Sequence, residues 1–378
     1  MDTILILTSA ILAFVLTYIS IPPIIRVSKA KHLFDEINKR KVHKSQIPSL
    51  GGVAIFIGLV ISLLLTINGF DFLKMKYLLA GVIMVFFIGL KDDIMVISAH
   101  KKLLVQITAA LIITVLGGYR FTNLHGMFGI HDLGYTWSVL ISVFAIVGIT
   151  NAYNLIDGID GLASGVAMVA ALTFGTWFLV AGHPEYAVLS YALTGSLLAF
   201  IRYNVFGKEY KLFMGDTGSL IIGLVISALV IRFNEVNILY NGPHDIVAAP
   251  VVSLAVIIVP VIDTIRVFTV RILRGKSPFS PDKNHVHHWL LDLYKNHIKV
   301  TSTIVVVNIL LILAGLAICK IGVNINVKFA LLFILGIMVA LIPKSLLIYR
   351  DKKNGIPQPQ APVIKKPRME FSAVEEVR

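Results

Sequence analysis

Residues 137–181 decide the fold, because they hold two apolar runs on either side of a short polar turn. The stretch reads WSVLISVFAIVGITNAYNL at 137–155, IDGIDG at 156–161 and LASGVAMVAALTFGTWFLVA at 162–181. A helix needs about 20 apolar residues to cross the hydrocarbon core of a bilayer, which is about 30 Å thick. The stretch therefore predicts two membrane-spanning helices, joined by a turn that carries two carboxylates.

The same alternation of apolar run and polar connector continues along all 378 residues. The apolar runs are 3–25, 50–67, 77–90, 103–116, 137–155, 162–181, 186–201, 217–231, 246–262, 301–319 and 329–343, and none contains Asp, Glu, Lys or Arg. The sequence predicts an all-α, polytopic integral membrane protein with about 11 transmembrane helices. Ten remain an alternative, because some of the runs are shorter than 20 residues.

The composition supports this class and excludes others. Hydrophobic residues make up 57% of the chain and charged residues 15%, against about 45–50% and about 25% in soluble domains. A soluble enzyme and a disordered chain are excluded on these values. The single cysteine, Cys319, excludes an internal disulfide.

The basic residues predict the orientation, because Lys and Arg are retained on the cytoplasmic side. The connectors 26–49, 91–102, 202–216, 263–300 and 344–378 hold 28 of the 34 Lys and Arg residues. This places the N-terminus outside and the C-terminus in the cytoplasm. The net charge of +13 is thus a feature of the membrane surface and does not indicate nucleic acid. We expect a membrane-embedded domain at 1–350 and a disordered cytoplasmic tail at 351–378.

Six carboxylates fall at the predicted cytoplasmic ends of the spans, namely Asp92, Asp93, Asp157, Asp160, Asp216 and Asp263. A carboxylate near hydrocarbon costs several kcal/mol, so its presence indicates a function. Neighbouring carboxylates form the oxygen environment that Mg²⁺ prefers, and Mg²⁺ commonly bridges substrate phosphates. The alternative for Asp92 and Asp93 is a helix-end cap or an ion pair with Lys91.

Two motifs bring further polar groups to this face. Residues 151–162, NAYNLIDGIDGL, place Asn154, Asp157 and Gly161 on one helical face, although a plain polar turn would also explain the acids and glycines. Residues 213–219, FMGDTGS, precede a span, so Asp216 or Thr217 is a natural N-cap. The same helix start also offers backbone N–H groups to an anionic substrate.

Three histidines lie in the longest polar connector, in the sequence HVHH at 285–288. A structural zinc site is disfavoured, because no cysteine is nearby. Together with Arg266, Arg271, Arg274, Lys276 and Lys283 the histidines suit a cytoplasmic cup for phosphates. A solvated basic loop is the alternative for this connector. For Lys102, the alternative is a side chain that extends to the lipid headgroups. The alternative for the basic cluster Lys39, Arg40, Lys41, His43 and Lys44 is a signal that sets the orientation in the membrane.

Acids, amides and histidines on one membrane face favour phosphoryl transfer between a phosphorylated lipid and a soluble phosphate donor. A transporter would carry polar groups at the bilayer midplane, where these spans have no charge. A non-catalytic scaffold would not need the gathered acids. Both classes remain alternatives.

The motifs, in order, resemble those of the polyprenyl-phosphate N-acetylhexosamine-1-phosphate transferases (glycosyltransferase family 4). The residues that carry the resemblance are Asp92-Asp93, 151–162, 213–219 and 277–288, joined by Arg40 to His43, Pro48, Gly51-Gly52, Lys102 to Gln106 and Asp263-Thr264. HVHH, in place of three consecutive histidines, is similar to the undecaprenyl-phosphate N-acetylglucosamine-1-phosphate transferase branch. The peptidoglycan branch, which uses UDP-muramoyl-pentapeptide, is the alternative.

This resemblance implies the reaction of undecaprenyl phosphate with a UDP-N-acetylhexosamine, releasing UMP, in a bacterial inner membrane. It implies Mg²⁺, replaceable by Mn²⁺, held by Asp216 with Asp93. The implied catalytic residues are Asp92 as base or orienting carboxylate, Asp93 and Asp157. The implied substrate-binding residues are Lys102, Asn151, Asn154, Asp160, Asn204, His285, His287 and His288. Membrane lipids are the expected surroundings, and a homodimer is left open.

Overall fold

The computed structural model describes residues 2–33, 47–67, 69–239, 242–275, 277 and 284–355, without the side chains of 69–72 and 74. Within these ranges the protein is helical and contains no strand, only an isolated bridge between Asn123 and Asp132. The all-α fold class is therefore confirmed.

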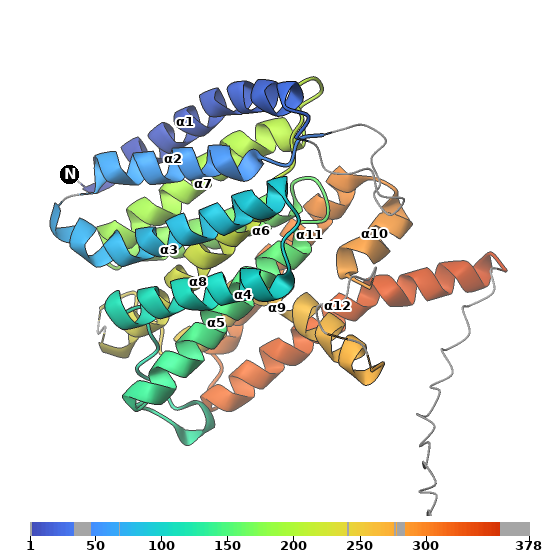
Figure 1. Ribbon diagram of the computed structural model, residues 1–378. Coiled ribbons are helices and arrows are strands. Elements are labelled where there is room, and N and C mark those ends of the chain that lie inside the picture. The colour runs from blue at the N-terminus through green and yellow to red at the C-terminus, as the bar shows by residue number, and fades with distance from the viewer. Residues whose placement is uncertain are drawn as a thin grey trace, which may run out of the picture.

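The helices follow one another along the chain with short connections (Figure 1). They are α1 (Asp2–Ala30), α2 (Gly51–Thr66), α3 (Gly69–Ile94), α4 (Ala99–Leu111) with the π-helical η1 (Ile112–Leu116), the 3-10 turn η2 (Met127–Gly129), α5 (Tyr135–Ile156), α6 (Leu162–Val180), α7 (Pro184–Asn204), α8 (Gly215–Leu239), α9 (Ala249–Leu273), α10 (Val286–Tyr294), α11 (His297–Cys319) and α12 (Ile325–Lys353).

Each predicted apolar run coincides with one of these helices, and the sequence missed only the short ones. In the described part, nine helices are long and apolar enough to cross a membrane, and α2 is a shorter apolar helix. The chain is thus a multi-pass membrane protein, while the number of spans and their orientation stay predictions. Helix α10 was not predicted as an element, because its nine residues are too few to span.

Helix α8 lies at the centre of the bundle. The most apolar 18-residue window of α8 is 83% buried inside the protein, against 11% for α12. Figure 1 shows α1, α2 and α7 along one edge and α12 along the other, with the red end of α12 projecting past the bundle. The residues around α8 are therefore positioned by protein contacts, whereas most of the apolar window of α12 is not buried inside the protein.

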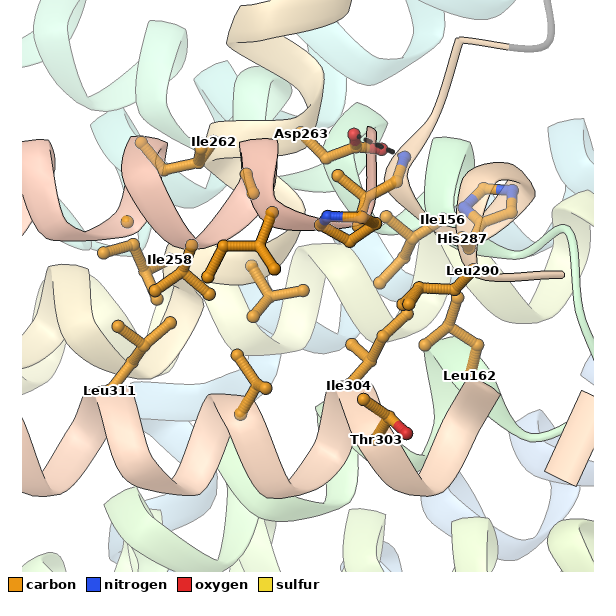
Figure 2. Close-up of a pocket in the computed structure, with 18 of the residues that line it drawn as sticks. Ile156, Leu162, Ile258, Ile262, Asp263, His287, Leu290, Thr303, Ile304 and Leu311 are labelled. Carbon is orange, nitrogen blue, oxygen red and sulfur yellow. Dashed lines mark hydrogen bonds between the residues drawn. The ribbon is translucent and has the colours of Figure 1, made fainter. Parts of the chain in front are cut away.

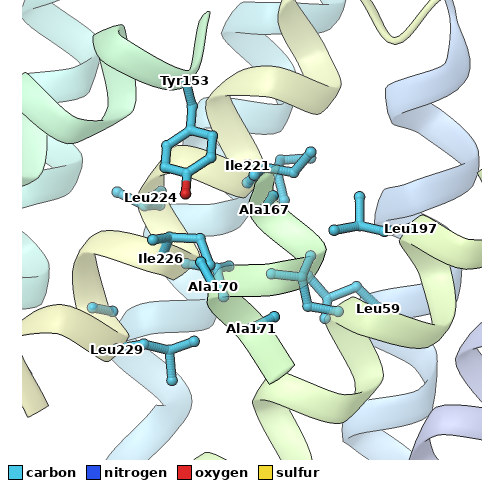
Figure 3. Packing of buried hydrophobic residues seen from close by; sticks show 14 of the residues in the cluster. Leu59, Tyr153, Ala167, Ala170, Ala171, Leu197, Ile221, Leu224, Ile226 and Leu229 are labelled. Carbon is cyan, nitrogen blue, oxygen red and sulfur yellow. The ribbon is translucent and has the colours of Figure 1, made fainter. Parts of the chain in front are cut away.

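Small side chains allow the central helices to approach closely. Figure 3 shows Ala170 and Ala171 of α6 against Leu224 of α8 and Leu59 of α2, with the ring of Tyr153 above them. All five residues are at most 1% exposed. In lipid, the hydrophobic effect does not favour contact between helices, because lipid tails are as apolar as the side chains. Close van der Waals packing of this kind therefore holds the spans together.

The start of α8 is fixed by backbone hydrogen bonds to the segment before α2. Gly51 N donates to Phe213 O at 2.9 Å, Gly52 N donates to Met214 O at 2.8 Å, and Phe213 N donates to the carbonyl of Pro48 at 2.8 Å. A carboxylate at the start of α8 is therefore held rigidly relative to α2.

Three sets of predicted residues fall outside the described ranges. They are the basic cluster at 39–44, Lys276 and Lys283 of the connector that holds the histidines, and the tail from 356 onward. Helix α12 itself continues to Lys353, three residues past the predicted boundary of the membrane domain.

Candidate active site

Lys102 lies between two of the predicted acids, at the converging ends of α3, α4, α5 and α8. Its Nζ is 2.5 Å from Asp216 Oδ2 and 3.2 Å from Asp92 Oδ2. Asn154 Nδ2 donates to Asp216 Oδ1 at 2.5 Å and to Ser219 Oγ at 2.9 Å. The sequence predicts that Lys102, Asp92, Asp216 and Asn154 share a site, and direct contacts join all four.

Asp93 contacts the start of α8 rather than Lys102. Its Oδ1 accepts from the backbone N–H of Asp216 at 2.7 Å, and its Oδ2 accepts from the backbone N–H of Thr217 at 3.0 Å and from Thr217 Oγ1 at 2.5 Å. This differs from the expectation that Asp216 or Thr217 caps the helix. The cap comes from α3, so these N–H groups are already occupied by the chain's own carboxylate.

Asp157 follows the last residue of α5 and contributes an unpaired carboxylate. Among the described residues, no hydrogen bond or ion pair reaches this carboxylate. Burial, followed by the charges of Asp216, Asp93 and Asp160, raises the pKa of Asp157 to about 8. The raised pKa disfavours the ionised form of Asp157 near pH 7, and a cation bound beside these acids would favour that form.

Asp160 makes contacts that hold the turn to neighbouring elements. Lys211 Nζ is 2.6 Å from Asp160 Oδ2, and His297 Nδ1 is 3.1 Å from the same oxygen. Burial alone would raise the pKa of Asp160, but the hydrogen bonds from His297 and Lys211 bring it below its ordinary value. The ionised Asp160 side chain thus links the turn to Lys211 on the α7–α8 connection and to His297 on α11. It does not contact Lys102.

Asn151 and Asn204 also hold neighbouring elements together. Asn151 Nδ2 donates to Gln106 Oε1 at 2.7 Å, which joins α5 to α4 one turn deeper than Lys102. Asn204 Oδ1 accepts from Gly161 N at 2.7 Å, and its Nδ2 donates to Leu212 O at 2.9 Å. Neither amide is part of the Lys102 cluster.

The histidine motif is organised by Asp263, which lies inside α9 because this helix continues past the predicted end of the span at 262 to Leu273. Asp263 Oδ2 is 2.7 Å from His285 Nδ1, and its Oδ1 accepts from Arg266 at 2.7 Å and from Val286 N at 3.0 Å. The Arg266 guanidinium lies 4.1 Å from the ring centre of Trp289. One buried carboxylate therefore orients a histidine, an arginine and the start of α10.

The three histidine rings pack against one another. Ring centres are 5.3 Å apart for His285 and His287, and 4.4 Å apart for His287 and His288. Burial, with a smaller effect of His288, lowers the pKa of His287 to about 3, so its ring is neutral. The ring rests on Gly158, where a Cβ would lie 2.7 Å from His287 Nε2. The histidine group thus adjoins the turn that carries Asp157.

An apolar pocket of about 160 Å³ lies beneath the histidine group. Figure 2 shows Asp263 and His287 on one side of this pocket, and Ile304 and Leu311 of α11 on the other. Only the Asp263 and His287 end offers strongly polar groups.

A larger apolar cavity, of about 640 Å³, is lined mainly by α5 and α9. Its lining includes Asn151, one helical turn from Asn154, and Leu103, which follows Lys102. Residues next to the Lys102 cluster on α4 and α5 therefore contribute to the lining of the cavity.

Two groups of residues could hold a metal ion. Asp157 and Asp216 offer carboxylate oxygens, which are the donors that Mg²⁺ prefers, and the unpaired Asp157 carboxylate is an observation in favour of a cation there. Asp263, His285 and His287 offer ligand atoms within 4.8 Å of one another. This second set is rich in imidazole, which suits transition metals better than Mg²⁺.

Several residues of these networks had no predicted role or only a general one. Thr217 and Ser219 stand in the quoted 213–219 motif, and Arg266 was grouped only with the basic residues of its connector. The i, i+3 spacing of Asp263 and Arg266 was a usable signal. Lys211 and His297 carried no signal, because they meet Asp160 only through the packing of distant helices.

Known proteins that are similar in sequence to this chain belong to one family. The profile of glycosyl transferase family 4 matches residues 75–234, which include Asp92, Lys102, Asn154 and Asp216. A Bacillus subtilis (strain 168) protein named probable undecaprenyl-phosphate N-acetylglucosaminyl 1-phosphate transferase is 33% identical over 290 residues, 76% of this chain and 78% of that protein.

Two further relatives carry the name undecaprenyl-phosphate alpha-N-acetylglucosaminyl 1-phosphate transferase. The Yersinia pestis protein is 30% identical over 262 residues, 68% of this chain and 69% of that protein. The Escherichia coli (strain K12) protein is 29% identical over 269 residues, 70% of this chain and 71% of that protein. The chain therefore belongs to glycosyl transferase family 4, as its motifs predict, and is a transferase embedded in a membrane.

Proposed function

We propose that the protein transfers N-acetylglucosamine-1-phosphate from UDP-N-acetylglucosamine to undecaprenyl phosphate. The products are undecaprenyl-diphospho-N-acetylglucosamine and UMP. The observation that carries the proposal is the Lys102 cluster, a cation paired with two carboxylates, together with an apolar cavity lined by Leu103, the residue after Lys102. The names of the relatives support the same pair of substrates.

The lipid substrate fits the cavity between α5 and α9. An isoprenoid chain is wholly apolar, and most of the side chains that line the cavity, such as Phe144 and Ile257, are apolar too. The lipid phosphate would then lie beside Lys102, whose ammonium group attracts a phosphate as a point charge. The ion pairs of Lys102 with Asp92 and Asp216 hold the ammonium group in place before substrate arrives.

The nucleotide sugar fits the polar surface formed by the histidine group and Arg266. Arg266 is fixed by Asp263 and by Trp289, so its guanidinium is oriented for binding phosphate. His285 is oriented by the same carboxylate. We assign the diphosphate or the sugar of the donor to His285, His287 and His288.

In the proposed reaction, an oxygen of the lipid phosphate attacks the β-phosphorus of the donor. The new bond joins the two phosphates, and the bond from the β-phosphorus to the bridging oxygen breaks, so that UMP leaves. A phosphate monoester is largely ionised near pH 7. Asp92, held by the N–H of Ile97 at 2.8 Å, is therefore assigned to orient the reacting groups. Mg²⁺, when held by Asp216 and Asp157, would neutralise charge that develops on the phosphates.

We assign the site to the cytoplasmic face of a bacterial inner membrane, where 28 of the 34 basic residues are predicted to lie. The product would be the first lipid-linked intermediate of a cell-envelope polysaccharide. UDP-sugars are charged and soluble, so the donor has to reach the site from the aqueous side.

The test is UMP release by purified protein in detergent with undecaprenyl phosphate and Mg²⁺. UDP-N-acetylglucosamine, UDP-N-acetylgalactosamine and UDP-muramoyl-pentapeptide are supplied in parallel. Release with UDP-N-acetylglucosamine alone supports the proposal. Release only with UDP-muramoyl-pentapeptide assigns the protein to the peptidoglycan branch, and release with none of the three donors indicates another phospho-sugar donor.

Substitutions in the cluster test the site itself. We expect Asp92→Asn, Asp157→Asn and Asp216→Asn each to abolish UMP release while the protein remains folded in the membrane. Asp292→Asn is the matched control, because the Asp292 side chain is exposed and, within the described ranges, its ion pair is with Lys295 at the same helix end. Normal turnover in all three site variants would contradict the assignment.

A further inference from the structure

Asp93 belongs to the predicted pair of catalytic acids, yet its contacts are those of a helix cap. Three donors reach its two oxygens, and all three come from Asp216 and Thr217 at the first turn of α8. A helix leaves its first N–H groups without partners inside the helix, and a carboxylate satisfies them while favouring the positive end of the helix dipole. Asp93 performs this task from a different helix.

The surrounding backbone is built for this contact. Gly215 has a φ of +72°, and a Cβ at this position would lie 2.6 Å from both Asp93 oxygens. At Gly89, one turn before Asp93 on α3, a Cβ would lie 2.5 Å from Thr217 Cα. Two glycines thus let the end of α3 touch the start of α8, where no side chain would fit.

The cap bears directly on Asp216. The backbone N–H of Asp216 is bound by Asp93 on α3, while its carboxylate is bound by Lys102 on α4 and by Asn154 on α5. Thr217, whose hydroxyl completes the cap, is fully buried. The position of the Asp216 carboxylate relative to Lys102 therefore depends on where Asp93 holds the first turn of α8.

We propose that Asp93 is a positioning residue that acts through Thr217 and the α8 backbone to place Asp216, rather than a metal ligand. This inference rests on the proposed function only where it is tested by the rate of UMP release. Three of the about four acceptor sites of this carboxylate are already occupied by donors from one helix start. The cap explains all of its observed contacts without a metal.

The first test is hydrogen exchange of the peptide that contains Asp216 and Thr217, measured by mass spectrometry on the full-length protein in detergent. Asp93→Asn places an amide N–H₂ against N–H donors, so we expect these two amides to exchange at least about tenfold faster. Asp216→Asn leaves the cap intact and is the matched control. Unchanged exchange in Asp93→Asn would overturn the proposal.

The second test separates positioning from ligation. Thr217→Val removes only the hydroxyl that donates to Asp93, so we expect a fall in kcat that Asp93→Asn shares, with the KM of the donor within about twofold of wild type. A misplacement of about 1 Å can cost about a hundredfold in rate. Thr217→Ser retains the hydroxyl and should recover most of the rate.

The Mg²⁺ concentration that gives half-maximal rate provides the decisive contrast. A positioning role shifts it in the same direction and by a similar factor in Asp93→Asn and in Thr217→Val, because both variants displace Asp216, to which the proposed function assigns the metal. A ligand role raises it in Asp93→Asn alone, with Thr217→Val like wild type, and this result would overturn the proposal. If the wild-type protein releases no UMP from any donor, the proposed function fails, and the exchange measurement still decides whether Asp93 is the cap.

Discussion

Replacing Gly52 by alanine is expected to disturb the start of α8 through a backbone contact. Gly52 lies in the first turn of α2, and its Cα faces the α8 residues that follow Asp216. A Cβ at this position would lie 2.1 Å from Gly218 N and 2.6 Å from Thr217 Cβ. Because a backbone atom stands in the way, no rotation of a side chain can relieve the overlap.

The size of the disturbance follows from the distance. Real Cβ contacts essentially never fall below 3.0 Å, so the separation must grow from 2.1 Å by about 0.9 Å. Overpacking of this kind costs about 1–3 kcal/mol of stability. A displacement of about 1 Å beside a catalytic group can lower the rate by about a hundredfold. We therefore expect a folded variant with kcat reduced by about that factor.

The assay is UMP release per folded molecule, with the folded fraction determined by size-exclusion chromatography and thermal melting. Gly195→Ala is the matched control, because a Cβ there would lie 2.1 Å from the carbonyl oxygen of Ala10, at the contact of α7 with α1. Both variants strain a helix contact equally, but only Gly52→Ala strains one at the site. A kcat for Gly52→Ala within about twofold of wild type would refute the reasoning, and so would an equal loss in Gly195→Ala.

Three further outcomes follow from the structure. Asp160→Asn should lower the stability by about 3 kcal/mol at pH 7, since it breaks a buried link to Lys211 and His297. The pKa of Asp160 is held below its ordinary value of 3.8, so melting curves should show this difference in full above pH 4 and lose it as pH falls through the lowered pKa. Gly158→Ala should raise the KM for the nucleotide sugar in steady-state assays, because its Cβ would push against His287 Nε2, while an unchanged KM would separate that ring from the donor site. EDTA should abolish UMP release and Mg²⁺ or Mn²⁺ should restore it, since both accept oxygen ligands; full activity in chelator would remove the metal from the proposal.

The helices could be predicted because their signal is local. A run of about 20 apolar residues has no stable alternative to a helix in a bilayer, so each run corresponds to one helix in the structure. The placement of acids at the ends of these runs also follows from the sequence, because a charge is costly inside the hydrocarbon. This reasoning brought Asp92 and Asp216 into one predicted site, and the family resemblance added Lys102.

The roles within the site could not be predicted in the same way. Asp92 and Asp93 are neighbours with the same side chain, yet one pairs with Lys102 and the other caps α8. The rotation of α3 about its axis, relative to α4 and α8, decides which of the two acids pairs with Lys102 and which caps α8. That rotation is set by packing at many positions along the helices, so no short motif encodes it.

The sequence by itself determined the membrane class, the all-α fold, the family and the face of the membrane domain on which the polar residues gather. These properties depend on hydrophobicity and on short motifs, which are local in the chain. The tertiary structure decided which polar groups meet, such as Asp160 with His297 and Asp263 with His285. Such pairs are many residues apart, and their contacts form only when helix packing at distant positions brings the ends of the spans together.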